Sequence, residues 1–349
     1  MTSFQQLTVL EKPLERPPHL QRLLEMLTYR RPAGSRSEMK FIRRYLYPIK
    51  NIQMDDYGNL IHQIGDSPIM WSCHTDTVHR DQGRQQIVVK GNTVTLNNDK
   101  NSNCLGADCT AGVWMMLEMI KAEVPGLYVF HREEECGGKG SIFLSENHPE
   151  LFDNIKYAIA FDRRGTSSII THQYGGRCCS AEFAQSLSKA IGMGHVEDAG
   201  GSFTDTANYT HLIGECSNIS IGYQGEHGPK ESLDLDYLDR LRWAILSADF
   251  SELVAKRQPG EEEPWEDIWD YRGGYGGYLS GDKKANATYQ NGAWTWDDDQ
   301  EPKVARSNRS LASLIRDHYD EVADWLEEEG MDAKMMADII YARGGAVKL

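Results

Sequence analysis

The 349-residue sequence lacks any long hydrophobic run. No segment approaches the roughly 18 uninterrupted apolar residues of a membrane span, and residues 1–10 do not join a basic region to an apolar one, as a secretory leader does. The seven cysteines show no even spacing, and Cys178 and Cys179 are adjacent, which argues against a disulfide framework. We therefore expect a cytoplasmic protein with reduced thiols and no membrane partner.

Positive charge is also scarce, because 37 basic residues face 52 acidic ones and the formal net charge is −15. Nucleic acids and anionic lipid surfaces bind basic patches, so we expect neither as a partner. The imbalance is concentrated in residues 259–349, which hold 20 of the acidic and 10 of the basic residues. This change in composition predicts a domain boundary near Pro259.

Residues 1–258 alternate short apolar runs with amphipathic segments. Apolar runs predict core strands, and apolar residues at helical spacing predict helices. Strands that alternate with helices indicate an α/β domain of three layers (α/β/α), with a mixed, mostly parallel central sheet. The expected strands cover residues 67–71, 126–130, 157–161 and 217–222, the hairpins 52–64 and 87–96, and the helices 19–29, 37–46, 113–121, 181–191, 202–212 and 235–255.

Polar side chains stand where the expected strands end and where one expected helix begins. Because parallel strands share their carboxyl edge, where ligands and chemistry collect, we expect these side chains to lie together. Two simpler readings stay open. A histidine two residues before an aspartate is also typical of a hydrogen-bonded loop histidine, and an acid just before a helix is most often an N-cap. The set comprises His74, Asp108, Glu134, Glu135, Asp162 and His227.

The acids of this set indicate a bound cation. Residues 133–135 are consecutive glutamates at a strand end, where like charges repel and a cation would relieve the repulsion. Two imidazoles with three or four carboxylates suit zinc, manganese or cobalt, and two such ions about 3.5 Å apart usually share a carboxylate. Asp76 falls on the same side of an extended segment as His74, so it can orient that ring.

In their order along the chain, these motifs resemble those of the di-zinc exopeptidase clan, which contains the aminoacylase, glutamate carboxypeptidase and peptidase T group and related zinc aminopeptidases. The similarity spans residues 35–256. Asp56-Tyr57-Gly58-Asn59-Leu60 and Thr204-Asp205 also resemble clan motifs. The five main motifs are His74-Thr75-Asp76-Thr77-Val78, Gly106-Ala107-Asp108, Glu134-Glu135-Cys136-Gly137-Gly138-Lys139-Gly140, Asp162 after a strand, and His227 with Glu231.

The resemblance implies two zinc ions, with cobalt or manganese as alternatives. It places one ion on His74 and Asp162 and the other on Glu135 and His227, with Asp108 shared between them.

The resemblance also implies a catalytic role for Glu134 as the general base that acts on a metal-bound water, with Asp76 supporting the site. The implied activity is hydrolysis of a peptide or amide bond, most simply by an aminopeptidase-like exopeptidase acting on a peptide. Two alternatives use the same site: an N-acyl amino acid deacylase, whose substrate is an acyl-amino acid, and a carboxypeptidase. A catalytically silent binding or scaffold protein is the alternative from another class.

Three features depart from the clan or stay ambiguous. Cys109 follows the shared aspartate where the clan usually has a second aspartate, often across a cis peptide; it is either a small buried thiol or a further sulfur ligand. Only 64 residues, 163–226, separate Asp162 from His227, too few for the clan's inserted lid domain, so we expect none. Arg163 and Arg164 are either a surface pair or a dock for a substrate carboxylate.

Beyond residue 258 the resemblance ends. Residues 259–306 are acidic and rich in glycine, tyrosine and tryptophan, which predicts a linker or a cover over the site. Residues 307–349 show two amphipathic stretches, which predict a small helical hairpin. This C-terminal region either docks on its own catalytic domain or serves partner binding and oligomerisation.

Overall fold

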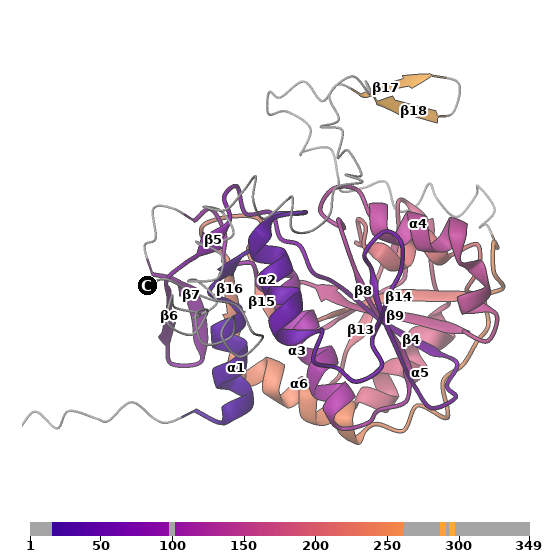
Figure 1. Cartoon of the computed structure of the whole chain (residues 1–349). Coiled ribbons are helices and arrows are strands. Elements are labelled where there is room, and N and C mark those ends of the chain that lie inside the picture. Colours follow the sequence, from indigo (N-terminus) through magenta and orange to yellow (C-terminus); the bar gives the residue numbers. More distant parts are fainter. Residues whose placement is uncertain (1–15, 98–101, 262–286, 291–292, 297–349) are drawn as a thin grey trace, which may run out of the picture. The chain divides into compact units, whose positions relative to one another are not determined.

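The computed structural model describes residues 16–97 and 102–261, together with the backbone of two short strands, β17 (Ala287–Gln290) and β18 (Ala293–Trp296), which pair as an antiparallel hairpin (Figure 1). The chain divides into two units, residues 1–274 and 275–349. The helical hairpin expected at 307–349, and the rest of the expected cover, lie outside the described residues. No helix in the described part has the length and apolarity to cross a membrane.

The first unit is built on an eight-stranded mixed sheet, whose strand order is β13-β10-β14-β9-β4-β8-β3-β2. Four adjacent strands, β14, β9, β4 and β8, run parallel, while β3 and β2 continue antiparallel at one edge. This confirms the predicted α/β sheet. The bounds are β2 Gln53–Met54, β3 Leu60–Ile64, β4 Ile69–His74, β8 Gly126–His131, β9 Tyr157–Arg163, β10 Ser168–Ile170, β13 Val196–Asp198 and β14 Glu215–Ser220.

The central strands are buried on both faces, as their continuous apolar runs predict. Neighbouring side chains point to opposite faces, so Met70 joins one hydrophobic cluster and Trp71 the other. The larger cluster is formed with α1 (Pro18–Met26), α2 (Arg36–Tyr45), α3 (Ala107–Lys121), α5 (Ala181–Ile191) and α6 (Leu235–Ser247). The smaller cluster lies with α4 (Lys139–Asn147) and two 3-10 helices, η1 (Pro149–Phe152) and η2 (Asp205–Tyr209). Figure 1 shows helices on both sides of the sheet.

Helix α3 packs unusually close to the sheet. A Cβ atom on Gly112 would lie 2.3 Å from the carbonyl oxygen of Phe161 in β9 and 2.4 Å from Cys109 Sγ. Only glycine permits that approach. The close contact brings the first turn of α3 beside the carboxyl ends of β4 and β9.

Two predicted helices are shorter than expected. The helix expected at 235–255 ends at Ser247, because Ala248 is extended and the Asp249 side chain accepts the backbone N–H of Ser251 in a local turn. The helix expected at 202–212 is only η2, because Thr204 does not cap it. The Thr204 hydroxyl instead donates to Asp162 Oδ2 at 2.7 Å, so a tertiary hydrogen bond replaces the cap.

A second sheet, of four short antiparallel strands, stands beside the first unit's main sheet. Both predicted hairpins form, one as β2 with β3 and the other as β6 with β7. The loop between β15 and β16 spans residues 225–231 and carries His227 and Glu231. The strands are β6 Ile87–Lys90, β7 Thr93–Leu96, β15 Tyr223–Gln224 and β16 Ser232–Asp234, and two-stranded pairs link β1 Tyr29–Arg30 with β5 Gly83–Arg84 and β11 His172–Gln173 with β12 Gly176–Arg177.

Candidate metal centre

The five predicted metal ligands converge at the carboxyl edge of the parallel strands. His74 ends β4 and Asp162 is the penultimate residue of β9. Asp108 lies in the first turn of α3, Glu135 in the turn after β8, and His227 in the loop between β15 and β16. Asp108 is therefore not an N-cap; Gly106 holds that position, and Asp108 has a non-helical backbone.

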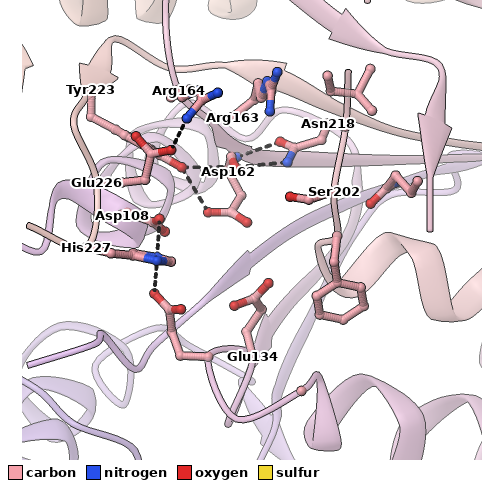
Figure 2. A pocket seen from close by; sticks show the side chains of 16 residues that line it. Asp108, Glu134, Asp162, Arg163, Arg164, Ser202, Asn218, Tyr223, Glu226 and His227 are labelled. Atoms are coloured by element: carbon pink, nitrogen blue, oxygen red, sulfur yellow. Dashed lines mark hydrogen bonds and ion pairs between the residues drawn. The ribbon is translucent and has the colours of Figure 1, made fainter. Parts of the chain in front are cut away.

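Asp108 links two groups of side chains through its two carboxylate oxygens, and Figure 2 shows its contact with His227. Its Oδ1 lies 3.1 Å from His74 Nε2, and its Oδ2 lies 3.1 Å from His227 Nε2. On the first side, Asp162 Oδ1 is 3.2 Å from His74 Nε2. On the second side, Glu135 Oε1 is 3.1 Å from His227 Nε2. A carboxylate shared in this way is what a two-metal centre requires.

The cluster holds more negative charge than its own cations balance. Burial raises the pKa of Glu134 well above its ordinary value. Burial and the charge of Asp108 raise the pKa of Glu135 to about 7 and that of Asp162 to about 6. Hydrogen bonds to Asp108 and Glu135 raise the pKa of His227 to about 11. This donor set of buried carboxylates and imidazoles fits a pair of divalent cations, because added positive charge would stabilise every acid in it.

Ligand atoms also lie close enough together for metal binding. One group of such atoms, all within 4.8 Å of one another, comes from His74, Asp108 and Glu135, and another comes from His74, Cys109 and Asp162. The peptide bond between Asp108 and Cys109 is cis. Cys109 is buried and its thiol donates to the Phe161 carbonyl oxygen at 3.1 Å. That hydrogen bond gives the thiol a structural partner in place of a metal.

Asp76 ties the histidine of one group to the two neighbouring glutamates. Its Oδ1 lies 3.4 Å from His74 Nδ1 and accepts the backbone N–H of Glu134 at 3.2 Å. Its Oδ2 accepts the backbone N–H of Glu135, also at 3.2 Å. Asp76 is fully buried, so it orients the ring and the turn that carries both acids. The Glu134 side chain reaches toward the centre, with Oε2 4.0 Å from His74 Nε2.

Glu231 supports the loop that delivers Asp108. Its Oε2 accepts the backbone N–H groups of Leu105 and Gly106 at 2.8 and 2.9 Å, and its Oε1 accepts those of Ala107 and Asp108 at 2.7 and 3.1 Å. In the sequence, Glu231 stood out only through its resemblance to the companion of the clan's last histidine. Its position four residues after His227 is the signal that marks it.

Three further residues hold Asp162, and only Thr204 stood out in the sequence, through the motif Thr204-Asp205. The Thr204 hydroxyl donates to its carboxylate, the Asn218 side chain exchanges hydrogen bonds with its backbone N–H and carbonyl at 2.9 Å each, and the Tyr223 hydroxyl donates to its carbonyl at 3.0 Å. Asn218 and Tyr223 carry no motif. Only the strand pairing of β14 with β9 brings Asn218 beside Asp162.

A pocket of about 290 Å³ opens over the cluster. Glu134, Glu135, Asp162 and Phe203 are among the residues that line it, and Figure 2 shows the side chains of Glu134 and Asp162 there. Arg163 and Arg164 also line this pocket, and their side chains are 16% and 50% exposed. The described residues 163–226 form strands, α5 and η2, and no separate lid domain stands among them.

Solved structures with a similar fold include peptidases. Aminopeptidase PepT from Bacillus cereus and a tripeptidase from Staphylococcus aureus each give a TM-score of 0.52 at 13% identity, with 66% of this chain and 96% of the other covered. An aminopeptidase from the archaeon Desulfurococcus kamchatkensis gives 0.51 at 15% identity, with 73% and 98% covered. No protein-family model and no curated protein matches the sequence. At this identity the likeness establishes the shared fold.

Proposed function

We propose that this protein is a metal-dependent, aminopeptidase-like exopeptidase that hydrolyses a peptide bond. The observation that carries the proposal is the Asp108 carboxylate, whose two oxygens reach two separate ligand groups beside Glu134. The peptidase folds among the similar structures, and the absence of a lid domain within residues 163–226, support the aminopeptidase class.

Two divalent cations, most simply zinc, would be held by His74 and Asp162 on one side and Glu135 and His227 on the other, with Asp108 between. When bound, such a pair lowers the pKa of water and polarises a carbonyl group.

The remaining chemistry falls to the protein's own side chains. Glu134 lies in the pocket and makes no ion pair shorter than 4.0 Å among the described residues, so its carboxylate can take a proton from the attacking water. The same carboxyl group can then give that proton to the leaving amine. Burial raises the pKa of this carboxyl group, which makes its carboxylate a stronger base in the first step. Asp76 fixes the turn that aims it.

The test is a pair of neighbouring substitutions. We expect Glu134→Gln to lower kcat at least about 100-fold, because a general base contributes that much, while about two metal ions per chain remain bound. Glu135→Gln should instead lose about one metal ion, because it removes a ligand. Metal analysis after dialysis and assays on a dipeptide measure both. Loss of a metal in Glu134→Gln together with normal metal in Glu135→Gln would overturn the assignment.

A further inference from the structure

Arg163, the residue after Asp162, lies in the wall of the pocket and is held in a fixed position. Arg163 ends β9 and lines the pocket, with a side chain only 16% exposed. Its Nη2 donates to Asp198 Oδ2 at 3.2 Å and to the Gly200 carbonyl oxygen at 3.1 Å. Its Nε is buried and finds no acceptor among the described residues. A buried donor without an acceptor is costly, so the contact with Asp198 leaves this guanidinium incompletely paired.

Asp198 is itself held in place, which orients the arginine before any ligand arrives. Asp198 ends β13, its Oδ2 accepts the Ser168 hydroxyl at 2.7 Å, and its Oδ1 accepts the backbone N–H of Gly200 at 2.7 Å. A guanidinium clamped at one edge loses little entropy when a ligand binds at another edge. Asp198 is therefore a positioning residue for Arg163.

The other charges of the pocket wall already face one another. Arg164 Nη1 donates to Glu226 Oε1 at 2.8 Å, and His227 lies between Asp108 and Glu135. Arg163 differs, because its acidic partner Asp198 is not among the residues that line the pocket. Among the described residues that line the pocket, Arg163 is thus the one whose charge is paired with an acid outside the pocket.

We propose that Arg163 binds a carboxylate group of the substrate, so that the site selects short or acidic peptides over amidated, uncharged ones. A carboxylate in the pocket would pair with this guanidinium through a charge-assisted hydrogen bond. The group can be the free α-carboxylate of a dipeptide, or the side chain of an acidic residue. This proposal rests on the proposed peptidase function, since it names the substrate class of the same site.

The kinetic test compares Leu-Leu with its C-terminal amide, and adds Glu-Leu amide to present only a side-chain carboxylate. We expect amidation of Leu-Leu to raise KM about 10- to 100-fold in the wild type, the range of one charge-assisted hydrogen bond, with little change in kcat. Arg163→Gln should raise KM for Leu-Leu to that of the amide. Asp198→Asn should move KM part of the way. Arg240→Gln, an exposed arginine of α6 paired with Asp236, is the matched control and should behave as wild type.

The third substrate identifies the source of the carboxylate. If Glu-Leu amide has the low KM and Leu-Leu does not, Arg163 binds an acidic side chain; the reverse result assigns the α-carboxylate. Equal KM values for all three wild-type substrates, or an Arg163→Gln effect that is the same on all three, would overturn the proposal.

A binding measurement separates this proposal from the peptidase function. Isothermal titration of leucine, leucinamide and Glu-Leu amide into zinc-loaded Glu134→Gln protein measures binding without turnover. We expect leucine or Glu-Leu amide to bind at least about tenfold more tightly than leucinamide, and the difference to vanish in Arg163→Gln but not in Arg240→Gln. If no peptide is cleaved yet this difference persists, the peptidase proposal fails and the carboxylate site stands. If peptides are cleaved but this difference in affinity is absent, the carboxylate site fails and the peptidase proposal stands.

Discussion

Glu231 accepts four backbone hydrogen bonds, and replacing it tests how the shared ligand Asp108 is positioned. In Glu231→Gln the side chain keeps one carbonyl oxygen and so can accept two of the four backbone N–H groups; its amide nitrogen then faces the other two donors. Each hydrogen bond to a charged group contributes about 1.5–3 kcal/mol, and removing the buried charge offsets part of that loss. We therefore expect the free energy of unfolding to fall by about 3 kcal/mol.

A matched control exists at the opposite end of the sheet. Glu215 begins β14 and is equally buried, and it accepts the backbone N–H groups of Ser180, Lys256 and Arg257 at 2.6, 2.7 and 2.8 Å, together with the Ser180 hydroxyl. Glu215→Gln should destabilise the protein by a similar amount, since it makes the same change to a similar cage. It lies far along the strand from the ligands, so it should leave metal binding unchanged.

Urea unfolding and competition with a zinc chelator give the two readouts. In Glu231→Gln we expect zinc affinity to fall about 10- to 100-fold, the usual effect of disturbing an outer-shell partner, because the backbone of Asp108 is no longer held. Equal zinc affinity in the two variants would show that Glu231 serves only stability. An unfolding free energy within about 0.5 kcal/mol of the wild type, the scale of ordinary surface substitutions, would refute the hydrogen-bond reasoning itself.

Two further perturbations test other parts of the structure. Chelation of divalent metals should stop hydrolysis and leave the far-ultraviolet circular dichroism spectrum unchanged, because both hydrophobic clusters are built from apolar side chains of the sheet and its helices; loss of helical signal at room temperature would contradict this. Burial lowers the pKa of His79 from 6.5 to about 4. As the pH falls, this histidine therefore takes up a proton in the unfolded chain before it does so in the folded protein. The share of the stability that depends on neutral His79 is present above pH 6.5 and is lost below that pH. Urea unfolding should show about 2 kcal/mol less pH dependence between pH 7 and pH 5 in His79→Asn than in the wild type, and equal slopes would show that His79 does not stay neutral in the fold.

Much of the fold could be predicted because its signals are local. Continuous apolar runs such as residues 69–71 mark strands buried on both faces, and the hydroxyl of Ser35 caps α2 by accepting the backbone N–H of Glu38. The helix expected at 202–212 was wrong because Thr204 is engaged by Asp162, which is distant in sequence. The length of α6 was wrong because the Asp249 turn competes with helical hydrogen bonds. In both cases tertiary or side-chain contacts overrode the local helix propensity.

Four ligands of the candidate centre were predictable for a related reason: His74, Glu135 and Asp162 lie at or after the ends of parallel strands and Asp108 lies at the start of α3. His227 comes instead from the loop between the antiparallel strands β15 and β16, and it was found through its motif. The residues that orient the ligands were harder to foresee. Thr204, Asn218 and Tyr223 act through hydrogen bonds that depend on the register of β14 against β9 and on the path of a loop. Neither the register nor the loop path leaves a periodic signal in the sequence.

A single buried carboxylate, that of Asp76, positions the neighbouring acids Glu134 and Glu135 for different roles. Glu133 has a positive φ of 58°, which turns the chain after β8, and Asp76 then accepts both of the next two backbone N–H groups. With the backbone fixed at two points, the two side chains diverge: Glu135 reaches His227, and Glu134 reaches the side of His74. Asp76 also lies against the far nitrogen of His74. The proposed base and one ligand from each side of the centre are therefore set by a single side chain, so their relative positions depend on the packing around Asp76.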